Sequence, residues 1–368
     1  MLNRTEEPPP NPSENYIAGH NPPAPVLTLH SNELFPRHYL VVENYRLYPF
    51  TIDAKPLFDR YVKHIPAPLS DYTFANNIIW LSQKSGFYQI IENCFCLFSL
   101  NGNCLTMLLP PLGMPAHQAA ALDACFRIMD GYNPTPYLSI AEYVYRDFAN
   151  VLEASHGRWL IERSLPDYIY RTPDLIQLKG NAYKTKRSEI NQFRRVHPDH
   201  RLERLGPQHW AGIRELIDTW LRNRLKYLSG EAIADFFYTV EQERQAIERA
   251  LTHYDTLGLR GLCLFIDNRL EGFTFGESIT PDVANVLVEK TNFAIPGSAQ
   301  FLFREFAKEF SDCTFINVGD DLGLENLRRV KMSYRPALFG EKFSLRRAGT
   351  HECRERQDVE SDRHNTPP

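Results

Sequence analysis

The stretch LRGLCLFIDNRLEGFTFGESITPDVANVLVEK, from Leu259 to Lys290, indicates the fold more clearly than any other part of the chain. Its three apolar runs are separated by Asp267–Asn268 and Pro281–Asp282, which are typical turn residues. We therefore predict a meander of three antiparallel strands. A loop, TNFAIPGS, then leads into AQFLFREFAKEF, which we predict to be a helix. A helix between strands usually joins parallel neighbours, so we expect a mixed sheet.

The same order of elements occurs twice along the chain. In the second half, two predicted helices precede the meander, one beginning at Pro207 and one over residues 230–252. Three further elements follow the meander: strand TFINVGDD, helix GLENLRRVKMSY and strand PALFGEKFSL. In the first half, predicted helices over 50–65 and 71–84 precede strands FYQIIENCFCLFSL and NCLTMLLPPLG, helix MPAHQAAALDACFRIM, a strand near 137–144 and a helix over 146–155. This order predicts an α/β (α+β) chain with two tandem domains, each a mixed sheet flanked by helices.

The predicted boundaries follow from this repeat and from composition. A length of 368 residues favours two domains, and 43% hydrophobic residues fit a globular chain. The domains are expected over 29–175 and 206–345, joined by a basic linker helix over 176–205. A proline-rich arm over 1–28 and a polar tail over 346–368 are expected to be disordered, because neither has enough apolar residues to offset its ordering entropy.

Composition also restricts the cellular setting. No apolar run approaches the roughly 18 to 20 residues that cross a bilayer, so we expect a cytoplasmic chain without a transmembrane segment. Seven cysteines, an odd number without metal-ligand spacing, indicate reduced thiols rather than disulfides. Cys94 and Cys96 lie two apart on a predicted strand and should point to one buried face. The twelve histidines also lack ligand spacing, and we expect no metal site.

Positive charge gathers in the linker of a chain whose net charge is −4. Residues 179–204 carry eight basic side chains against three acidic ones, and the basic ones are Lys179, Lys184, Lys186, Arg187, Arg194, Arg195, Arg201 and Arg204. Such a distribution fits a helix that touches a polyanion, for which tRNA, a CoA nucleotide and anionic lipid head groups all qualify. The alternative is a solvated helix face.

Two charged residues close the last strand of the meander. Glu289 and Lys290 stand where α/β sheets place ligand-binding groups, and alternation puts them on opposite faces. Glu289 is the candidate general base, provided that burial raises its pKa towards neutrality. Lys290 is a candidate substrate ligand. The alternative for both is an ion pair at the strand end.

The segment after the next strand holds further candidates. Asp320 is a candidate catalytic carboxylate, although a carboxylate before a helix more often caps it. Arg328 and Lys331, three residues apart, share a helix face and could hold a phosphate or an oxyanion. The alternative is a solvated face. Tyr334 is a candidate proton donor to a leaving group, and its alternative role is packing at the helix end.

Several motifs resemble a known family. These are SDYTFANNIIW (70–80), LLPPLG (108–113), DLIQLKGNAYKTKRSEINQF (174–193), VEKTN (288–292) and DDLGLENLRRVKMSYRP (320–336). In this order they resemble an uncharacterised bacterial family related to the C-terminal domain of phosphatidylglycerol lysyltransferases. The second half is also similar to the GNAT acyltransferase fold. The resemblance implies a tandem pair of GNAT-like domains from a superfamily that moves an amino acid from aminoacyl-tRNA to a lipid or peptidoglycan acceptor.

The GNAT resemblance also suggests how the loop after the meander would work. The acetyl-CoA loop of these enzymes reads Gln/Arg-x-x-Gly-x-Gly/Ala, and here Gly297 and Ala299 fill the last two positions while Ala294 replaces the first. Backbone N–H groups at the next helix could hold a phosphate. Asn292, Gly297 and Ser298 are therefore candidate substrate- or phosphate-binding residues. The alternative is a simple turn at Pro296–Gly297.

Two functional classes remain open from the sequence. One is an acyl or aminoacyl transferase that moves its group from acetyl-CoA, another acyl-CoA or an aminoacyl-tRNA to an amine or hydroxyl on a small molecule or lipid head group. The incomplete loop motif argues against ordinary acetyl-CoA use, and the basic stretch favours an aminoacyl-tRNA donor. The other class is a noncatalytic module that binds a nucleotide or lipid head group through a duplicated fold.

Overall fold

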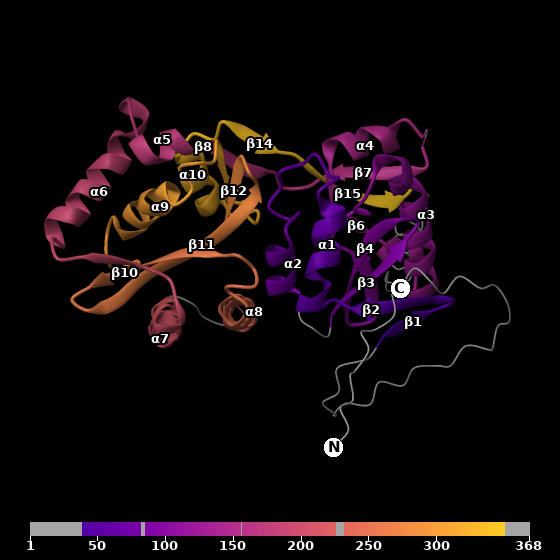
Figure 1. Ribbon diagram of the computed structural model, residues 1–368, viewed down its shortest axis with the longest axis horizontal. Helices are drawn as coiled ribbons and strands as arrows, with labels where there is room; N and C mark the ends of the chain where they lie inside the picture. Colours follow the sequence, from indigo (N-terminus) through magenta and orange to yellow (C-terminus); the bar gives the residue numbers. More distant parts are fainter. Residues whose placement is uncertain (1–38, 82–84, 156, 226–231, 350–368) are drawn as a thin grey trace, which may run out of the picture. The chain divides into compact units, whose positions relative to one another are not determined.

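The computed structural model contains two mixed sheets flanked by helices, so the predicted fold class is confirmed (Figure 1). The structure describes residues 39–81, 85–155, 157–225 and 232–349. The predicted disordered arm over 1–28 lies outside these residues, as does the predicted disordered tail except for residues 346–349. Arg346 and Arg347, which we assigned to that tail, instead end the last strand.

The first sheet has the strand order β1-β2-β3-β4-β5-β6-β15-β7. Its only parallel pair within the described residues is β5 with β6. The strands are β1 (Leu40–Val42), β2 (Tyr45–Pro49), β3 (Gly86–Ile91), β4 (Cys94–Asn101), β5 (Cys104–Met107), β6 (Ala141–Tyr145), β7 (Trp159–Arg163) and β15 (Lys342–Arg347). The helices of this half are α1 (Lys55–Val62), α2 (Phe74–Trp80), α3 (Pro115–Tyr132) and α4 (Arg146–Glu153).

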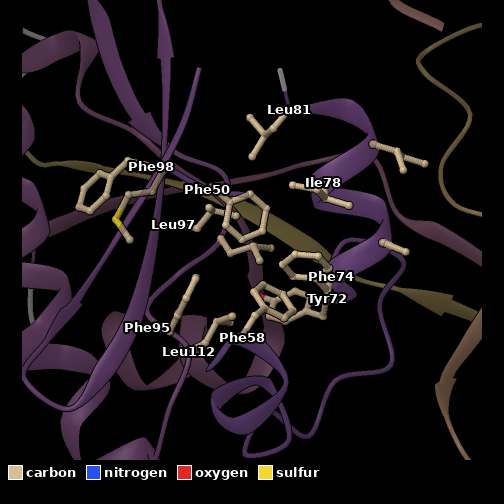
Figure 2. Packing of buried hydrophobic residues seen from close by; sticks show 14 of the residues in the cluster. Phe50, Phe58, Tyr72, Phe74, Ile78, Leu81, Phe95, Leu97, Phe98 and Leu112 are labelled. Carbon is tan, nitrogen blue, oxygen red and sulfur yellow. The ribbon is translucent and has the colours of Figure 1, made fainter. Parts of the chain in front are cut away.

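Aromatic side chains form the core between this sheet and α1 and α2. The Phe58 ring lies 5.5 Å from Phe95 of β4 and 5.6 Å from Phe74 of α2, and Phe50 lies 5.0 Å from Phe74 (Figure 2). All four rings are buried, and such tilted and edge contacts are the geometry that aromatic pairs prefer. Cys94 and Cys96, on either side of Phe95 in β4, are also buried, as predicted, and Cys96 meets Cys125 of α3 on the opposite face of the sheet.

The second sheet has the order β14-β8-β13-β12-β11-β10-β9. The predicted meander is β10, β11 and β12, and β12 then pairs parallel with β13. The strands are β8 (Asp167–Arg171), β9 (Arg201–Arg204), β10 (Arg260–Ile266), β11 (Arg269–Thr280), β12 (Val283–Thr291), β13 (Phe315–Asn317) and β14 (Leu338–Gly340). The helices are α5 (Thr172–Gln177), α6 (Lys184–Val196), α7 (Trp210–Leu225), α8 (Ala232–Thr252), α9 (Ser298–Lys308) and α10 (Glu325–Ser333). Helix α9 covers one face of the sheet, and α7 and α8 cover the other (Figure 1).

The two halves exchange strands, which differs from the predicted division at 175 and 206. Strand β8, which we placed in the first domain, pairs with β13 and β14 in the second sheet. Strand β15 returns from the end of the chain to lie between β6 and β7 in the first sheet. The single strand predicted over PALFGEKFSL is therefore two strands, β14 and β15, in different sheets. Local patterns predict a strand but not its partner, because pairing joins segments far apart in the sequence.

The basic stretch is not one linker helix. Leu178, at φ 49°, and Gly180, at φ 87°, separate α5 from α6. Helix α6 then buries Ile190 and Phe193, and the Phe193 ring lies 4.9 Å from Phe301 of α9. Helix α6 therefore belongs to the helical layer of the second sheet, with its polar side exposed.

Candidate functional site

Strand β12 carries the predicted general base on an unpaired part of its edge. Its pairing with β13 stops at Asn285, although β12 continues to Thr291. On the other edge, Phe275 pairs with Val288 but Gly276 pairs with Val286, so Leu287 is an extra, bulged residue. Gly276 suits this point because a Cβ there would lie 2.0 Å from the carbonyl oxygen of Asn285.

The bulge decides which face Glu289 occupies. Val286 packs with the core under α9, whereas Val288 joins the core on the opposite side. With one residue inserted, alternation resumes so that Glu289 faces α9 and Lys290 faces α7 and α8. Lys290 Nζ lies 2.7 Å from a carboxylate oxygen of Glu243 and 3.7 Å from the centre of the Trp220 ring. Glu289 and Lys290 therefore lie on opposite faces of the sheet, as predicted. Lys290 binds Glu243 on its own face and makes no contact with Glu289.

Glu289 as a whole is half-buried, but one oxygen of its carboxylate is buried and has no counter-charge among the described residues. Its Oε2 atom has no hydrogen-bond partner among the described residues, and no ion pair to it occurs there. Burial in this environment disfavours the charged form and raises the pKa of Glu289 to about 8. The alternative, a strand-end ion pair, thus applies to Lys290 and not to Glu289. A carboxylate with a pKa near neutrality is the property required of a general base.

Tyr334 ends helix α10 close enough to Glu289 for their charges to interact. Burial, and then the carboxylates of Glu289 and Glu189, raise the pKa of Tyr334. Its ring makes edge contacts with Phe303 at 5.0 Å and with Tyr170 at 6.2 Å. Tyr334 is therefore a packed residue at the helix end, as its alternative role predicts, and it lies within electrostatic range of the candidate base.

Lys186 approaches the other groups from α6. Its Nζ lies 4.6 Å from the centre of the Tyr334 ring and 3.9 Å from Glu189 Oε2. Burial lowers the pKa of Lys186, partly opposed by Glu189. The structure therefore brings together three of the predicted residues, Glu289, Tyr334 and Lys186.

The glycine-bearing loop is closed by α6. Gly297 has φ +82°, and a Cβ at this position would lie 2.4 Å from the carbonyl oxygen of Glu189. The Ser298 hydroxyl donates to the Ile295 carbonyl at 2.7 Å. Asn292 donates to Glu271 at 2.8 Å and accepts from the Ala294 N–H. These contacts favour the simple turn over the phosphate loop, because the polar groups already have partners within the protein.

We expect Gly297→Ala to destabilise the protein by about 2–4 kcal/mol, because the added methyl group combines backbone strain with a clash against α6. Gly180→Ala is the matched control. Gly180 has φ +87° but no heavy atom within 4 Å of a built Cβ, so only strain, of about 1 kcal/mol, should appear. Urea unfolding of both variants measures the difference. Equal losses would contradict the close packing of α6 on this loop.

The predicted cations of α10 bind the chain itself. Lys331 Nζ donates to the carbonyls of Val318, Gly319 and Asp320, just beyond β13. Burial lowers the pKa of Lys331 to about 8. Arg328 donates to Asp321 at 2.8 Å. The prediction that both residues hold a donor phosphate is not supported by these contacts.

The other predicted cations do not join them. Arg187 donates to the carbonyls of Leu178 and Gly180 and thereby holds the turn between α5 and α6. Lys184 is exposed at the first residue of α6. No contact among the described residues brings the linker cations to Arg328 or Lys331, and Lys186 reaches only Tyr334 at the end of α10.

Asp320 belongs to a buried ion cluster that the sequence did not reveal. Lys342 Nζ, at the start of β15, lies 2.8 Å from Asp167, 2.9 Å from Asp71 and 3.1 Å from Asp320. Burial opposes the charge on Lys342, but the three carboxylates prevail and raise its pKa. Burial raises the pKa of Asp71 to about 6 despite the attraction of Lys342. Asp320 is thus a structural partner of Lys342, and no contact connects it with Glu289.

The described residues contain neither a metal-binding cluster nor a membrane-spanning helix. No group of three or more His, Cys, Asp or Glu side chains has an arrangement that could hold a metal ion. None of the helices in the same ranges is both long enough and apolar enough to span a bilayer.

Comparison with known proteins places this arrangement in a family. The profile of the phosphatidylglycerol lysyltransferase C-terminal family matches residues 63–346. A search of curated proteins found no match. Among solved structures, a conserved protein of unknown function from Bacteroides thetaiotaomicron VPI-5482 is 25% identical with a TM-score of 0.70, and the alignment covers 83% of this chain and 100% of that one.

Two further structures share the fold at lower identity. One is the C-terminal domain of a protein assigned as a lysylphosphatidylglycerol synthetase from Agrobacterium fabrum, with 12% identity, a TM-score of 0.59, and coverage of 84% of this chain and 96% of that one. The other is L-PGS from Bacillus licheniformis, with 13% identity, a TM-score of 0.55, and coverage of 80% and 92%. The family match extends over most of the chain and includes Lys186, Glu289 and Tyr334. The chain therefore belongs to the family of phosphatidylglycerol lysyltransferase C-terminal domains.

Proposed function

We propose that this protein is an acyl or aminoacyl transferase in which Glu289 is the general base. The observation that carries the proposal is the half-buried Glu289 on the unpaired edge of β12, whose buried Oε2 has no partner among the described residues and whose pKa is raised to about 8. A structural carboxylate is normally paired or hydrogen-bonded, because an unpaired buried charge is costly. Family membership favours the transferase class.

The proposed reaction needs one proton transfer to Glu289. The carboxylate takes a proton from the attacking amine or hydroxyl of the acceptor, and the freed electron pair forms a bond to the donor carbonyl carbon. Collapse of the tetrahedral intermediate breaks the bond to the donor, and the leaving thiol or ribose hydroxyl takes up a proton. The charge of Glu289 acts on Tyr334, and we assign Tyr334 to shaping the site and to donating that proton. The proton that Glu289 took up then returns to the Tyr334 oxygen, which resets both groups.

For the donor, we favour aminoacyl-tRNA over acetyl-CoA. The loop at Gly297 is closed by α6 and lacks the first residue of the acetyl-CoA motif. The exposed cations Lys184, Arg194 and Arg195 of α6 suit a nucleic-acid backbone. A lipid head group or a small molecule is the proposed acceptor. Both donors are made in the cytoplasm, so the proposal includes a cytoplasmic location.

The direct test is group transfer by the purified full chain. The donors are acetyl-CoA and a mixture of charged tRNAs, each carrying a radiolabelled acyl group. Each donor is tested with three acceptors: a primary amine, glycerol and phosphatidylglycerol vesicles. We expect label to move from charged tRNA to one acceptor. Tight binding of tRNA or CoA without transfer to any acceptor would instead establish the noncatalytic module.

The transfer rate should depend on pH through Glu289. A general base acts when deprotonated, so kcat/KM should rise about tenfold per pH unit below its pKa. The rise should level off above pH 8, since the pKa of Glu289 is about 8. Initial rates between pH 6 and 9.5 give the profile. A rate that is flat across this range would remove Glu289 from the proton transfer.

A further inference from the structure

The carbonyl groups at the end of helix α10 lack partners within the helix and need donors from elsewhere. Tyr334 follows the last helical residue, Arg335 has φ 57°, and Pro336 comes next without an N–H group. The Tyr183 hydroxyl donates to the Tyr334 carbonyl at 3.0 Å. Tyr183 is 7% exposed, and no other hydrogen bond to this carbonyl occurs among the described residues. A side chain 151 positions away therefore closes the end of α10.

The turn between α5 and α6 fixes the position of Tyr183. This residue is the last of the 3₁₀ helix η4 (Asn181–Tyr183) and directly precedes α6. Arg187, in the first turn of α6, donates to the carbonyls of Leu178 and Gly180 on the other side of η4. The Tyr183 side chain is buried in the core under α9. Its hydroxyl is therefore presented by a buried, hydrogen-bonded segment, which is the condition for holding a second group in place.

The same segment also reaches the ring of Tyr334. Lys186 Nζ lies 4.6 Å from the ring centre, so the start of α6 holds Tyr334 both at its carbonyl and at its ring. Tyr334 is 8% exposed, and the charge of Glu289 acts on it. A shift of the backbone at the end of α10 would change the distance between the Tyr334 hydroxyl and the Glu289 carboxylate. Displacements of about 1 Å are enough to slow a reaction about 100-fold, so the carbonyl contact bears on catalysis.

We infer that Tyr183 is a positioning residue, whose hydrogen bond to the Tyr334 carbonyl sets the distance between the Tyr334 hydroxyl and Glu289. Tyr183 acts through Tyr334 and takes no part in proton transfer itself. The distance matters because Tyr334 gives a proton to the leaving group and regains it from Glu289. For its kinetic consequence this inference rests on the proposed function, but the contact can also be tested without any donor.

Tyr170→Phe is the matched control for Tyr183→Phe. The Tyr170 hydroxyl donates to the Lys331 carbonyl at 2.9 Å, three residues earlier in α10. That carbonyl also accepts the Tyr334 N–H at 3.1 Å, so it keeps a partner when the hydroxyl is removed. Each variant removes one hydroxyl and keeps the ring. Only Tyr183→Phe leaves the Tyr334 carbonyl without a partner among the described residues.

The kinetic test compares transfer by these variants with transfer by the unaltered chain. We expect Tyr183→Phe to lower kcat about 10–100-fold with little change in KM, because the proton donor is misplaced while binding is not. Tyr170→Phe should change kcat by about twofold or less. In a Tyr334→Phe background, Tyr183→Phe should add no further loss, because it acts through the Tyr334 hydroxyl. An unchanged kcat in Tyr183→Phe, an equal loss in Tyr170→Phe, or a further loss in the Tyr334→Phe background would overturn the inference.

A measurement without donor separates this inference from the proposed function. If the end of α10 loosens, water reaches the Glu289 carboxylate and its pKa falls from about 8 towards the ordinary value of 4.5. Urea unfolding between pH 5 and pH 8 detects this fall, and Glu289→Gln identifies the part of the pH dependence that belongs to Glu289. We expect Tyr183→Phe, but not Tyr170→Phe, to reduce that part. An unchanged part would contradict the inference, whereas the expected reduction in a chain that transfers no group would refute the proposed function alone.

Discussion

Replacing Glu289 by glutamine should slow transfer by about 10²–10⁴-fold, because general-base catalysis contributes rate factors of this size. The same change should make the protein more stable. Glutamine has nearly the shape of glutamate but carries no charge, so it removes the cost of a buried, unpaired carboxylate. A residue that lowers stability while it supports activity is the signature of a functional site.

The sign of the stability effect follows from proton linkage. At a pH below the ordinary glutamate value of 4.5, both folded and unfolded chains hold the proton, and Glu289 costs nothing. Between pH 4.5 and about 8 only the folded chain holds it, so the free energy of unfolding falls as pH rises. We expect Glu289→Gln to gain about 4 kcal/mol at pH 8 and about 1 kcal/mol or less at pH 5.

Glu277 provides a matched control for this variant. It is a buried glutamate of β11 whose Oε1 also lacks a hydrogen-bond partner, and burial raises its pKa to about 7. Glu277→Gln should therefore also stabilise the protein near pH 8. Its effect on transfer should be small, because Glu277 interacts with Thr73 before α2, away from the Glu289 site. Urea unfolding and transfer rates of both variants, at pH 5 and pH 8, complete the comparison. A Glu289→Gln protein that keeps its full transfer rate would falsify the assignment of the base.

Replacing Lys342 by methionine should cost about 3–5 kcal/mol of the free energy of unfolding, the usual loss when one partner of a buried ion pair is removed. Lys342 is 1% exposed, and its ammonium is shared by Asp71, Asp167 and Asp320. Without it, three carboxylates remain close together and must repel or take up protons. We expect a lower urea midpoint and, at 37 °C, reduced yield of folded protein.

An exposed ion pair provides the comparison for Lys342. Lys55 lies 2.5 Å from Asp59 one helical turn away, and both side chains are partly exposed. Lys55→Met should change the unfolding free energy by about 0.5 kcal/mol or less. Suppose that Lys342→Met lowered the unfolding free energy no more than this control does. The three carboxylates would then have to share protons without the lysine, and the cluster would not stabilise the contact between strands of the two sheets.

The sequence alone determined much of the second sheet. Turn residues at Asp267–Asn268 and Pro281–Asp282 placed the meander correctly, because these residues adopt turn conformations regardless of distant contacts. Alternation along β12 correctly put Glu289 and Lys290 on opposite faces. Motifs spread along the chain indicated the family, which the match over residues 63–346 confirms.

Only the tertiary structure decided which face each group occupies and what lies beside it. A single bulged residue, Leu287, turned Glu289 towards α9, and such an insertion arises from pairing with β11 rather than from the local pattern. Lys342 meets Asp71 across 271 positions, and strand β15 returns to the first sheet. Periodicity and turn residues report only on neighbours within a few positions of the sequence. Strand pairing, buried ion clusters and the binding of lysine and arginine side chains by backbone carbonyls depend on segments that become neighbours only when the chain folds.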